Sequence, residues 1–498
     1  MKRTVRQIIE YLQLSDEDVI TQGEGQLHGT DSAYEYIAVA SEGEATDQIS
    51  GVSTDSRKIQ QGELFVPLVG EHSDGHAYRH MAYERGSFVS IWDKRTALPE
   101  IPGIYLLVND TLEALQTIAH QYRKSLTAKV IAITGSNGKT TTKDFLVSML
   151  ARQYKVHGTQ GNLNNHIGVP LTLLGMEDDT EYAVIEMGMN HFGEIQRLTE
   201  IAEPDIGVIT NIGESHIEHF GTRDAISYAK FELVQTMQSG TALINFDEPL
   251  LRQRVAEFLE PSDNSGPSLI GYGMSAPDAR YRAKIVSHKK IIRSSSLLGL
   301  LDQTAQQSSD YTITTPGPHT IYNALAAIVA AKQCAVTDEC IQNGLDQVKV
   351  TPMRMEITQI GSSHIINDAY NASPTSMKAV ITYLSDIEEP YKKIALLGDM
   401  KELGESSEEY HYQIGQWLLE KAIDHIYAYG ENARLYTQPL VENGRADAAD
   451  YFRFGEEQAL VSQLKREIAQ GCILMVKGSR GMKMERFIQM INDGEDES

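Results

Sequence analysis

Short apolar runs alternate with amphipathic stretches through the middle of the chain. The runs lie at 129–134, 182–187, 205–212 and 241–246. Apolar runs of this length, separated by segments with one apolar face, are typical of strands that are buried on both faces of a parallel sheet. The pattern therefore predicts an α/β domain in which helices cover a parallel sheet.

The last third of the chain repeats this alternation. Its apolar runs lie at 364–367, 393–398, 425–430 and 472–477. We expect a second parallel-sheet domain here, of the Rossmann-like type.

The first part of the chain has a different pattern. A short amphipathic helix is expected at 1–12, and an apolar strand bounded by glycines at 62–70. The segment 22–51 between them is polar, glycine-rich and acidic. We therefore expect a small α/β domain that carries a surface insertion near 22–48.

The length of the chain also indicates several domains. At 498 residues it is longer than a single hydrophobic core usually supports. We place the domains at 1–125, 126–350 and 351–498, so that the polar junctions near 126 and 350 are the expected hinges.

The charge of the chain narrows the classes of partner. Lys and Arg total 44 against 68 Asp and Glu, which gives a net charge of −24. An acidic surface repels nucleic-acid phosphates and anionic lipids, so a role on DNA, RNA or a membrane surface is disfavoured. The composition is that of an ordinary large enzyme.

The cysteines and the apolar runs indicate where such an enzyme works. The three cysteines, Cys334, Cys340 and Cys472, are odd in number and lack metal-ligand spacing, as expected in a reducing compartment. No apolar run reaches the roughly 18 residues of a membrane-spanning helix, and the charged N-terminus does not resemble a signal peptide. We expect a cytoplasmic, monomeric protein without membrane insertion.

The first run leads directly into a candidate phosphate-binding loop, Gly135-Ser-Asn-Gly-Lys-Thr140. Glycines allow a tight turn with exposed N–H groups, Lys139 supplies a positive charge for phosphates, and Thr140 offers a hydroxyl to Mg²⁺ at a helix N-terminus. The full P-loop pattern has another glycine at the position of Ile133, so this is a shorter variant. Although such a turn can be an ordinary strand-to-helix connection, the strand before it and the helix pattern after it favour ATP.

Further polar residues follow the ends of the neighbouring strands, where open parallel sheets bind ligands. Glu186 could hold a second metal contact or merely cap a helix, and His216 could be a ligand or a hydrogen-bonded loop residue. Lys230 on a predicted helix could simply face solvent. His216 and His219 are three residues apart rather than four, which excludes the helical zinc-peptidase motif.

Together these motifs resemble the Mur ligase family, ATP-dependent ligases that join amino acids or peptides to a UDP-linked muramoyl precursor. The resemblance covers nearly the whole chain. The shared motifs include the phosphate loop, 161–170, 186–188, Thr210-Asn-Ile with His216, 317–323 and 354–356. The most specific matches, at 368–376, 397–404 and 476–480, are to the branch that adds D-alanyl-D-alanine to UDP-N-acetylmuramoyl-tripeptide. In the first domain, 53–57, 62–65 and 74–76 resemble the uridine-nucleotide region.

The resemblance implies roles for individual residues. The catalytic set is Lys139, Lys230, His216, Glu186 and Arg354. The ATP-binding set is Gly135, Ser136, Asn137, Gly138, Lys139, Thr140, Thr141, Asn245, His319, Asn323, Arg354, Asp368 and Tyr370. The Mg²⁺ ligands are Thr140, Glu186, His216 and Lys230, the last as a carbamate formed with CO₂. The substrate-binding set is Ser53, Asp55, Ser56, Arg57, Asn371, Ser376, Lys477, Ser479 and Arg480.

The implied reaction passes through an acyl phosphate on the tripeptide carboxylate, which the amine of D-alanyl-D-alanine attacks. The chain departs from the family pattern at Thr320 and Ser373, where asparagines are usual. Three alternatives stay open: a sister ligase that adds the third residue, a folate polyglutamate ligase, and a P-loop switch without ligation. The third peptide residue, meso-diaminopimelate or L-lysine, is also open.

Overall fold

The computed structural model describes residues 1–22, 38–39, 45–46, 48–71, 73–260, 266–293 and 295–493. By their internal contacts these residues form two compact units. The first unit comprises 1–132, 154–188 and 194–205, and the second comprises 133–153, 189–193 and 206–498. The expected insertion near 22–48 lies largely outside the described residues.

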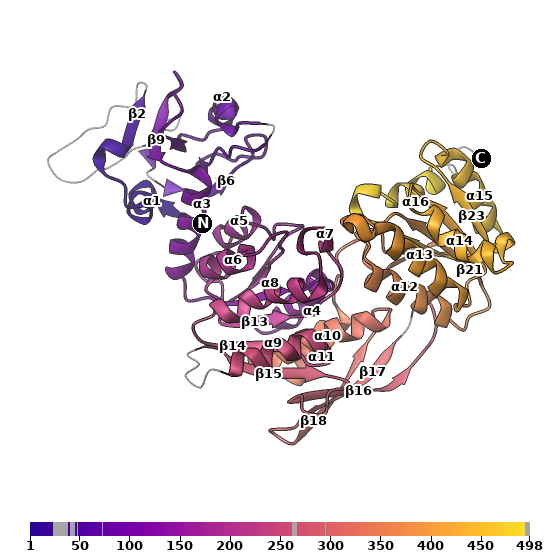
Figure 1. The fold of residues 1–498 in the computed structure, drawn as a ribbon. Helices are drawn as coiled ribbons and strands as arrows, with labels where there is room; N and C mark the ends of the chain where they lie inside the picture. The colour runs from indigo at the N-terminus through magenta and orange to yellow at the C-terminus, as the bar shows by residue number, and fades with distance from the viewer. Residues whose placement is uncertain are drawn as a thin grey trace. The chain divides into compact units, whose positions relative to one another are not determined.

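A five-stranded sheet forms the core of the N-terminal part (Figure 1). Its order is β2 (Val19–Gln22), β9 (Gly103–Val108), β8 (Val89–Asp93), β7 (Glu63–Phe65) and β6 (Gly51–Ser53). All its pairs are parallel except β2 with β9. The helices are α1 (Val5–Leu12), α2 (Arg79–Glu84) and α3 (Thr111–Lys124). The expected small α/β fold is therefore confirmed, as is the N-terminal helix.

The middle of the chain forms a nine-stranded sheet. Its order is β11 (Val156–Gly158), β12 (Tyr182–Glu186), β10 (Lys129–Thr134), β13 (Ile206–Ile209), β14 (Thr241–Asn245), β15 (Ser268–Gly273), β16 (Tyr281–His288), β17 (Ser296–Asp302) and β18 (Gln307–Ile313). The helices are α4 (Lys139–Leu150), α5 (Gly168–Leu174), α6 (Glu194–Ala202), α7 (Ile217–Phe220), α8 (Arg223–Thr236), α9 (Pro249–Leu259), α10 (Pro318–Gln333) and α11 (Asp338–Asp346). Strands were correctly predicted at each of the apolar runs.

The expected parallel sheet continues into an antiparallel edge. Strands β13 to β16 pair in parallel, but β16, β17 and β18 pair antiparallel. The reason is visible in β16, where buried and exposed side chains alternate at its start before the strand becomes exposed. Strands with one solvated face suit antiparallel pairing.

The C-terminal part forms a six-stranded sheet, as expected for a Rossmann-like domain. Its order is β19 (Glu356–Ile360), β20 (Ser363–Asn367), β24 (Cys472–Lys477), β21 (Lys392–Gly398), β22 (His425–Tyr429) and β23 (Ala449–Phe452), and only β19 with β20 is antiparallel. The helices are α12 (Pro374–Asp386), α13 (Ser407–Leu419), α14 (Arg434–Glu442), α15 (Glu457–Gln470) and α16 (Glu485–Asn492). Helix α13 packs between α12 and α14, while α15 packs on α16 (Figure 1).

A buried carboxylate fixes the ends of the central strands of this sheet. Asp399 follows β21 and is fully buried. Its oxygens accept hydrogen bonds from the backbone N–H groups of Glu431, Asn432 and Ala433, which follow β22. The loop 399–404, which contains one of the family motifs, is thereby anchored at its first residue.

The described helices include none with the length and apolar character that crossing a membrane requires.

Candidate active site

The phosphate loop has no room for side chains at its two glycines. Gly135 has φ of 149° and Gly138 has φ of 81°, both unfavourable for other residues. A Cβ atom on Gly135 would lie 1.9 Å from Thr210 Oγ1, and one on Gly138 would lie 2.1 Å from Asn323 Oδ1. Gly138 is also the N-cap of α4 and has no side chain to cap it. An N-terminus of this kind is suited to phosphate.

Residues of the loop that follows β13 hold the phosphate loop in shape. Thr210 Oγ1 and Asn211 Nδ2 donate to the carbonyl of Asn137 at 2.7 and 3.0 Å, and the N–H of Asn137 donates to Asn211 Oδ1 at 3.0 Å. Ser215 Oγ donates to the carbonyl of Ser136 at 3.3 Å. The Thr210-Asn-Ile motif therefore has a structural role: it fixes the backbone of the phosphate loop.

Two lysines bear on the charge at this loop, one as a cation and the other as a buried amine. Lys139 Nζ donates to the carbonyl of Gly135 at 2.9 Å. Lys230 on α8 is 1% exposed, so it does not face solvent as an ordinary helix lysine would. Its pKa lies well below the usual lysine value because burial disfavours the charged form, and the charge of Lys139 lowers it further. Burial therefore shifts Lys230 toward the neutral amine.

His216 adopts a left-handed conformation, with φ of 64°, immediately before α7. Its Nδ1 lies 2.7 Å from Glu402 Oε2, although this approach is not aligned as a regular hydrogen bond. The N–H of Glu218 donates to the backbone carbonyl of Glu402 at 3.3 Å. The imidazole lowers the pKa of Glu402. The sequence prediction missed Glu402, although the residue lies within the 397–404 motif.

Glu186 ends β12 and is 2% exposed. Its Oε1 accepts a hydrogen bond from Asn164 Nδ2 at 2.8 Å, and its N–H donates to Thr159 Oγ1 at 2.9 Å. These contacts hold a carboxylate at a strand end, but they lie in the first unit, whereas Thr140, His216 and Lys230 belong to the second. The proposed Mg²⁺ set as a whole remains a prediction.

The chemistry of these donors fits Mg²⁺. Among the described residues, no three or more His, Cys, Asp and Glu side chains gather into a metal cage. Mg²⁺ does not need one, because it usually takes one or two carboxylates together with phosphate oxygens and water. The predicted set contains only Glu186 and His216 of these residue types, and Thr140 adds a hydroxyl at the first turn of α4.

Two residues of the predicted ATP set support the phosphate loop, and a third offers an unpaired ring nitrogen. Asn323 contacts Gly138 from α10, as described above. Asn245 ends β14 and donates to the carbonyl of Thr210 at 3.0 Å, so it supports the same loop. His319 is half-buried, its buried Nδ1 has no hydrogen-bond partner, and desolvation lowers its pKa. An unpartnered buried ring nitrogen is available to a ligand.

Arg354 stacks on an aromatic ring. Its guanidinium lies 4.0 Å from the centroid of the Tyr370 ring, and its Nε has no hydrogen-bond partner. The flanking residues Met353 and Met355 both have positive φ, 61° and 55°. Asp368 accepts a hydrogen bond from the N–H of Met355 at 3.0 Å, which holds this strained segment in place.

The residues predicted to bind the dipeptide differ in their exposure to solvent. Lys477 is 2% exposed and pairs with Asp368 at 2.5 Å. Ser479 is also buried, and its hydroxyl accepts from the N–H of Lys401. Arg480 pairs with Glu485 at 2.7 Å, yet its side chain is 53% exposed.

Two positions of the 371–376 motif are occupied by local hydrogen bonds. Ser376 forms a capping box with Ser373 at the start of α12, and Asn371 Oδ1 accepts from the N–H of Ala372. Ser373, one departure from the family pattern, thus caps a helix. The other departure, Thr320, donates its hydroxyl to the carbonyl of Pro316 at 2.7 Å.

The predicted uridine-nucleotide residues form a compact turn after β6. Arg57 makes a two-pronged ion pair with Asp55, with both N–O distances at 2.9 Å, and this contact lowers the pKa of Asp55 to about 2. Ser53 Oγ accepts from the N–H of Asp55, while Ser56 is buried and its hydroxyl lies 3.4 Å from the sulfur of Met81. Arg57 itself is largely exposed.

Residues of the C-terminal part contact the loops that carry the phosphate site. Ser373 Oγ donates to Asn137 Oδ1 at 3.3 Å. The N–H and the hydroxyl of Thr375 both donate to Glu214 Oε2, at 3.1 and 2.6 Å. With the Glu402–His216 pair, these contacts join α12 and the loop after β21 to both loops of the site.

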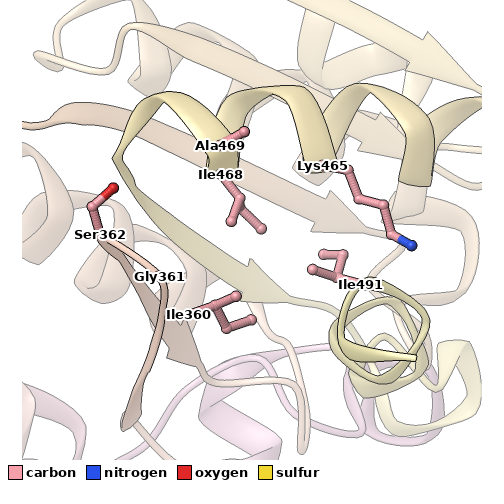
Figure 2. A pocket seen from close by; sticks show the side chains of 7 residues that line it. All are labelled: Ile360, Gly361, Ser362, Lys465, Ile468, Ala469 and Ile491. Atoms are coloured by element: carbon pink, nitrogen blue, oxygen red, sulfur yellow. The ribbon is translucent and has the colours of Figure 1, made fainter. Parts of the chain in front are cut away.

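A hollow of about 250 Å³ lies elsewhere in the C-terminal part (Figure 2). It is lined by Ile360, Gly361, Ser362, Lys465, Ile468, Ala469 and Ile491. None of the predicted site residues lines it, so we do not assign the nucleotide or the metal ion to it.

Comparison with known proteins assigns these regions to one family. The model of the "Mur ligase family, catalytic domain" matches residues 48–123, the "Mur ligase middle domain" matches 133–331, and the "Mur ligase, glutamate ligase domain" matches 353–480.

Two relatives with the same name are similar over most of their length. The UDP-N-acetylmuramoyl-tripeptide–D-alanyl-D-alanine ligase of Bacillus subtilis is 39% identical over 443 residues, 89% of this chain and 93% of the relative. The ligase of that name from Escherichia coli is 30% identical over 457 residues, 89% of this chain and 94% of the relative.

Solved structures agree with this assignment. A crystal structure of MurF from Acinetobacter baumannii matches with a TM-score of 0.81 and 29% identity over 99% of both chains. MurF ligase from Thermotoga maritima in complex with ADP matches with a TM-score of 0.77 and 25% identity, over 90% of this chain and 99% of that one.

The geometry of the phosphate loop predicts the effect of a single methyl group. Gly138→Ala places a Cβ against Asn323 Oδ1 and forces alanine into a left-handed conformation, which costs about 1–2 kcal/mol before any clash. Affinity for ADP with Mg²⁺, measured by isothermal titration calorimetry, should fall by about tenfold or more. Gly481→Ala is the control, because nothing lies within 4 Å of its added Cβ. Unchanged ADP affinity in Gly138→Ala would contradict the assignment.

Proposed function

The chain belongs to the Mur ligase family, and we propose that it joins D-alanyl-D-alanine to UDP-N-acetylmuramoyl-tripeptide at the expense of ATP. The product is the UDP-linked pentapeptide used in peptidoglycan synthesis and cell-wall biogenesis, which implies a cytoplasmic enzyme. The observation that carries the proposal is the phosphate loop, held by the Thr210-Asn-Ile segment, in a chain that matches ligases of this name almost end to end.

The chain's own residues supply positioning and charge at the site of phosphoryl transfer. The N-terminus of α4 and Lys139 face the developing negative charge of the phosphates, and phosphoryl transfer requires little else from a protein. Asn323 and Asn245 hold the loops around the nucleotide, and His319 offers its unpartnered Nδ1. Arg354, now stacked on Tyr370, could turn toward the phosphates.

Mg²⁺, when bound, neutralises the phosphate oxygens of ATP. Thr140, Glu186 and His216 would hold it, and Lys230 would contribute as a carbamate. The burial of Lys230, which lowers its pKa, supports this role, because only the neutral amine reacts with CO₂ and a lower pKa increases its share. In that reaction the nitrogen bonds to the carbon of CO₂ and releases one proton, which leaves an anionic carbamate.

The order of bond changes follows from the substrates. The tripeptide carboxylate attacks the γ-phosphorus and ADP leaves, which gives an acyl phosphate. The dipeptide amine then attacks the acyl carbon, phosphate leaves, and a peptide bond remains. Since water would hydrolyse the acyl phosphate, the site must exclude solvent during the reaction.

We assign the substrates to the three parts of the chain. Residues 1–125 would bind the UDP-tripeptide through Ser53, Asp55, Ser56 and Arg57, while 126–350 would bind ATP. Residues 351–498 would bind the dipeptide, whose free carboxylate we assign to Arg480. Its exposed guanidinium supports that choice over the buried Lys477.

A ligation assay tests the proposed function. Purified protein with ATP and Mg²⁺ should convert UDP-tripeptide to UDP-pentapeptide with D-alanyl-D-alanine, but not with single amino acids, as followed by mass spectrometry. Tripeptides with meso-diaminopimelate and with L-lysine should both be offered. Lys139→Ala should lower the rate by roughly a hundredfold or more, because it removes a charge that faces the phosphates.

The outcomes of this assay separate the alternatives. Equal turnover of single amino acids would identify a sister ligase, and glutamate addition to folate would identify a folate polyglutamate ligase. ATP hydrolysis without any ligated product would indicate a switch. Each of these results contradicts the proposed function.

The carbamate predicts a rescue experiment. Lys230→Ala should be nearly inactive and should regain part of its activity with added acetate or formate, because these anions replace the lost negative charge. In the unaltered protein, ¹³CO₂ should give a carbamate signal in the NMR spectrum that Lys230→Ala lacks. The exposed Lys124→Ala serves as the control. Full activity of Lys230→Ala without added carboxylate would rule out the role.

A further inference from the structure

The pairing of His216 with Glu402 is unusual in its backbone. The backbone of His216 and of Glu402 is in the left-handed region, with φ of 64° and 62°. Residues other than glycine seldom adopt this conformation. Nδ1 and Oε2 lie 2.7 Å apart, close but not aligned as a regular hydrogen bond, and the backbone carbonyl of Glu402 accepts a hydrogen bond from the N–H of Glu218. Thus both the side chain and the main chain of Glu402 meet the segment that begins at His216.

Stability alone does not account for this pair. The side chains are 22% and 48% exposed, and ion pairs in contact with water contribute little to stability. Left-handed backbone at two residues other than glycine is an energetic cost to the folded state. An arrangement that costs at least as much as it contributes points to a function for the orientation of the imidazole.

The position of Glu402 suggests what that function is. Its loop begins at the buried Asp399, whose oxygens are held by backbone N–H groups after β22. The carboxylate is therefore presented from a rigid base. His216 follows Ser215, which bonds to the phosphate loop. A carboxylate behind one ring nitrogen of a metal-binding histidine fixes the tautomer and directs the other nitrogen to the metal.

We propose that Glu402 is a positioning residue for His216: it accepts the Nδ1 proton, so that the lone pair on Nε2 is directed toward Mg²⁺ beside the ATP phosphates. The proposal rests on the proposed function, in which His216 holds the metal ion. It gives the C-terminal part of the chain a direct influence on the metal site.

A second contact on the same loop agrees with this inference. Two residues before His216, Glu214 accepts hydrogen bonds from the N–H and the hydroxyl of Thr375 in the first turn of α12. The segment 214–216 is therefore held from two separate elements of the C-terminal part. Loss of either contact alone would leave the other in place, so removal of the Glu402 carboxylate should reorient the imidazole without releasing the loop.

Metal binding, rather than turnover, tests the proposal. Mn²⁺ replaces Mg²⁺ as the probe, and free Mn²⁺ is measured by electron paramagnetic resonance in the full-length protein with a non-hydrolysable ATP analogue. Glu402→Ala should weaken Mn²⁺ binding by about tenfold or more, as losses of such supporting carboxylates do. Glu402→Gln should weaken it less, because its amide oxygen still accepts the Nδ1 proton. Glu405→Gln, at an exposed position in the short helical turn Gly404–Ser406 that follows this loop, should bind Mn²⁺ as the unaltered protein does.

A double-mutant cycle separates positioning from a general structural effect. If Glu402 acts through His216, then Glu402→Ala should add less than about a twofold further loss in a His216→Ala background. Losses that multiply in the double variant, or Mn²⁺ affinity in Glu402→Ala within about twofold of the unaltered protein, would overturn the proposal. Circular dichroism checks the fold, and if Glu402→Ala does not fold, the same cycle with Glu402→Gln decides.

The result can be told apart from failure of the proposed function. A protein that shows the Mn²⁺ coupling but ligates no dipeptide would reject the proposed reaction and leave the role of Glu402 intact. A protein that ligates the dipeptide but shows no coupling would reject the role of Glu402 alone.

Discussion

The packing of the phosphate loop against the loop after β13 is the constraint on which the candidate site depends. Gly135 lies so close to Thr210, and Gly138 so close to Asn323, that no side chain fits at either glycine. The hydrogen bonds from Thr210 and Asn211 to Asn137 then leave the backbone a single shape. Every later element of the site is placed relative to that shape: the N-terminus of α4, the lysines, and His216 at the end of the same loop.

Positive charge at the phosphate loop favours the binding of anions. Lys139 and the start of α4 are positive, and Lys230 is buried close enough to Lys139 for the two to interact. Burial of an uncompensated ammonium group is costly, which is why the neutral form of Lys230 is favoured. ATP phosphates and the proposed carbamate at Lys230 would both supply negative charge, so each would offset the positive charge of Lys139.

Much of this could be predicted from the sequence, because it is local. The strands at 129–134, 392–398 and 472–477 follow from short apolar runs, and the phosphate loop from a contiguous motif. Antiparallel pairing beyond β16 was not predicted, because it depends on which face of β16 is solvated. Burial of Lys230 and the contact of Glu402 with His216 were also not predicted. Both depend on segments far apart in the chain, and sequence pattern alone does not report such tertiary contacts.

The central claim is that ATP bound at the phosphate loop transfers its γ-phosphoryl group to the terminal carboxylate of the tripeptide. Chemical trapping tests this claim most directly. The protein is mixed with ATP, Mg²⁺ and UDP-N-acetylmuramoyl-tripeptide without the dipeptide, and borohydride is added to reduce any acyl phosphate to an alcohol. Mass spectrometry should find the alcohol at the terminal carboxyl of the tripeptide, in amounts that depend on ATP. Absence of that alcohol, in a preparation that ligates the dipeptide under the same conditions, would contradict the account.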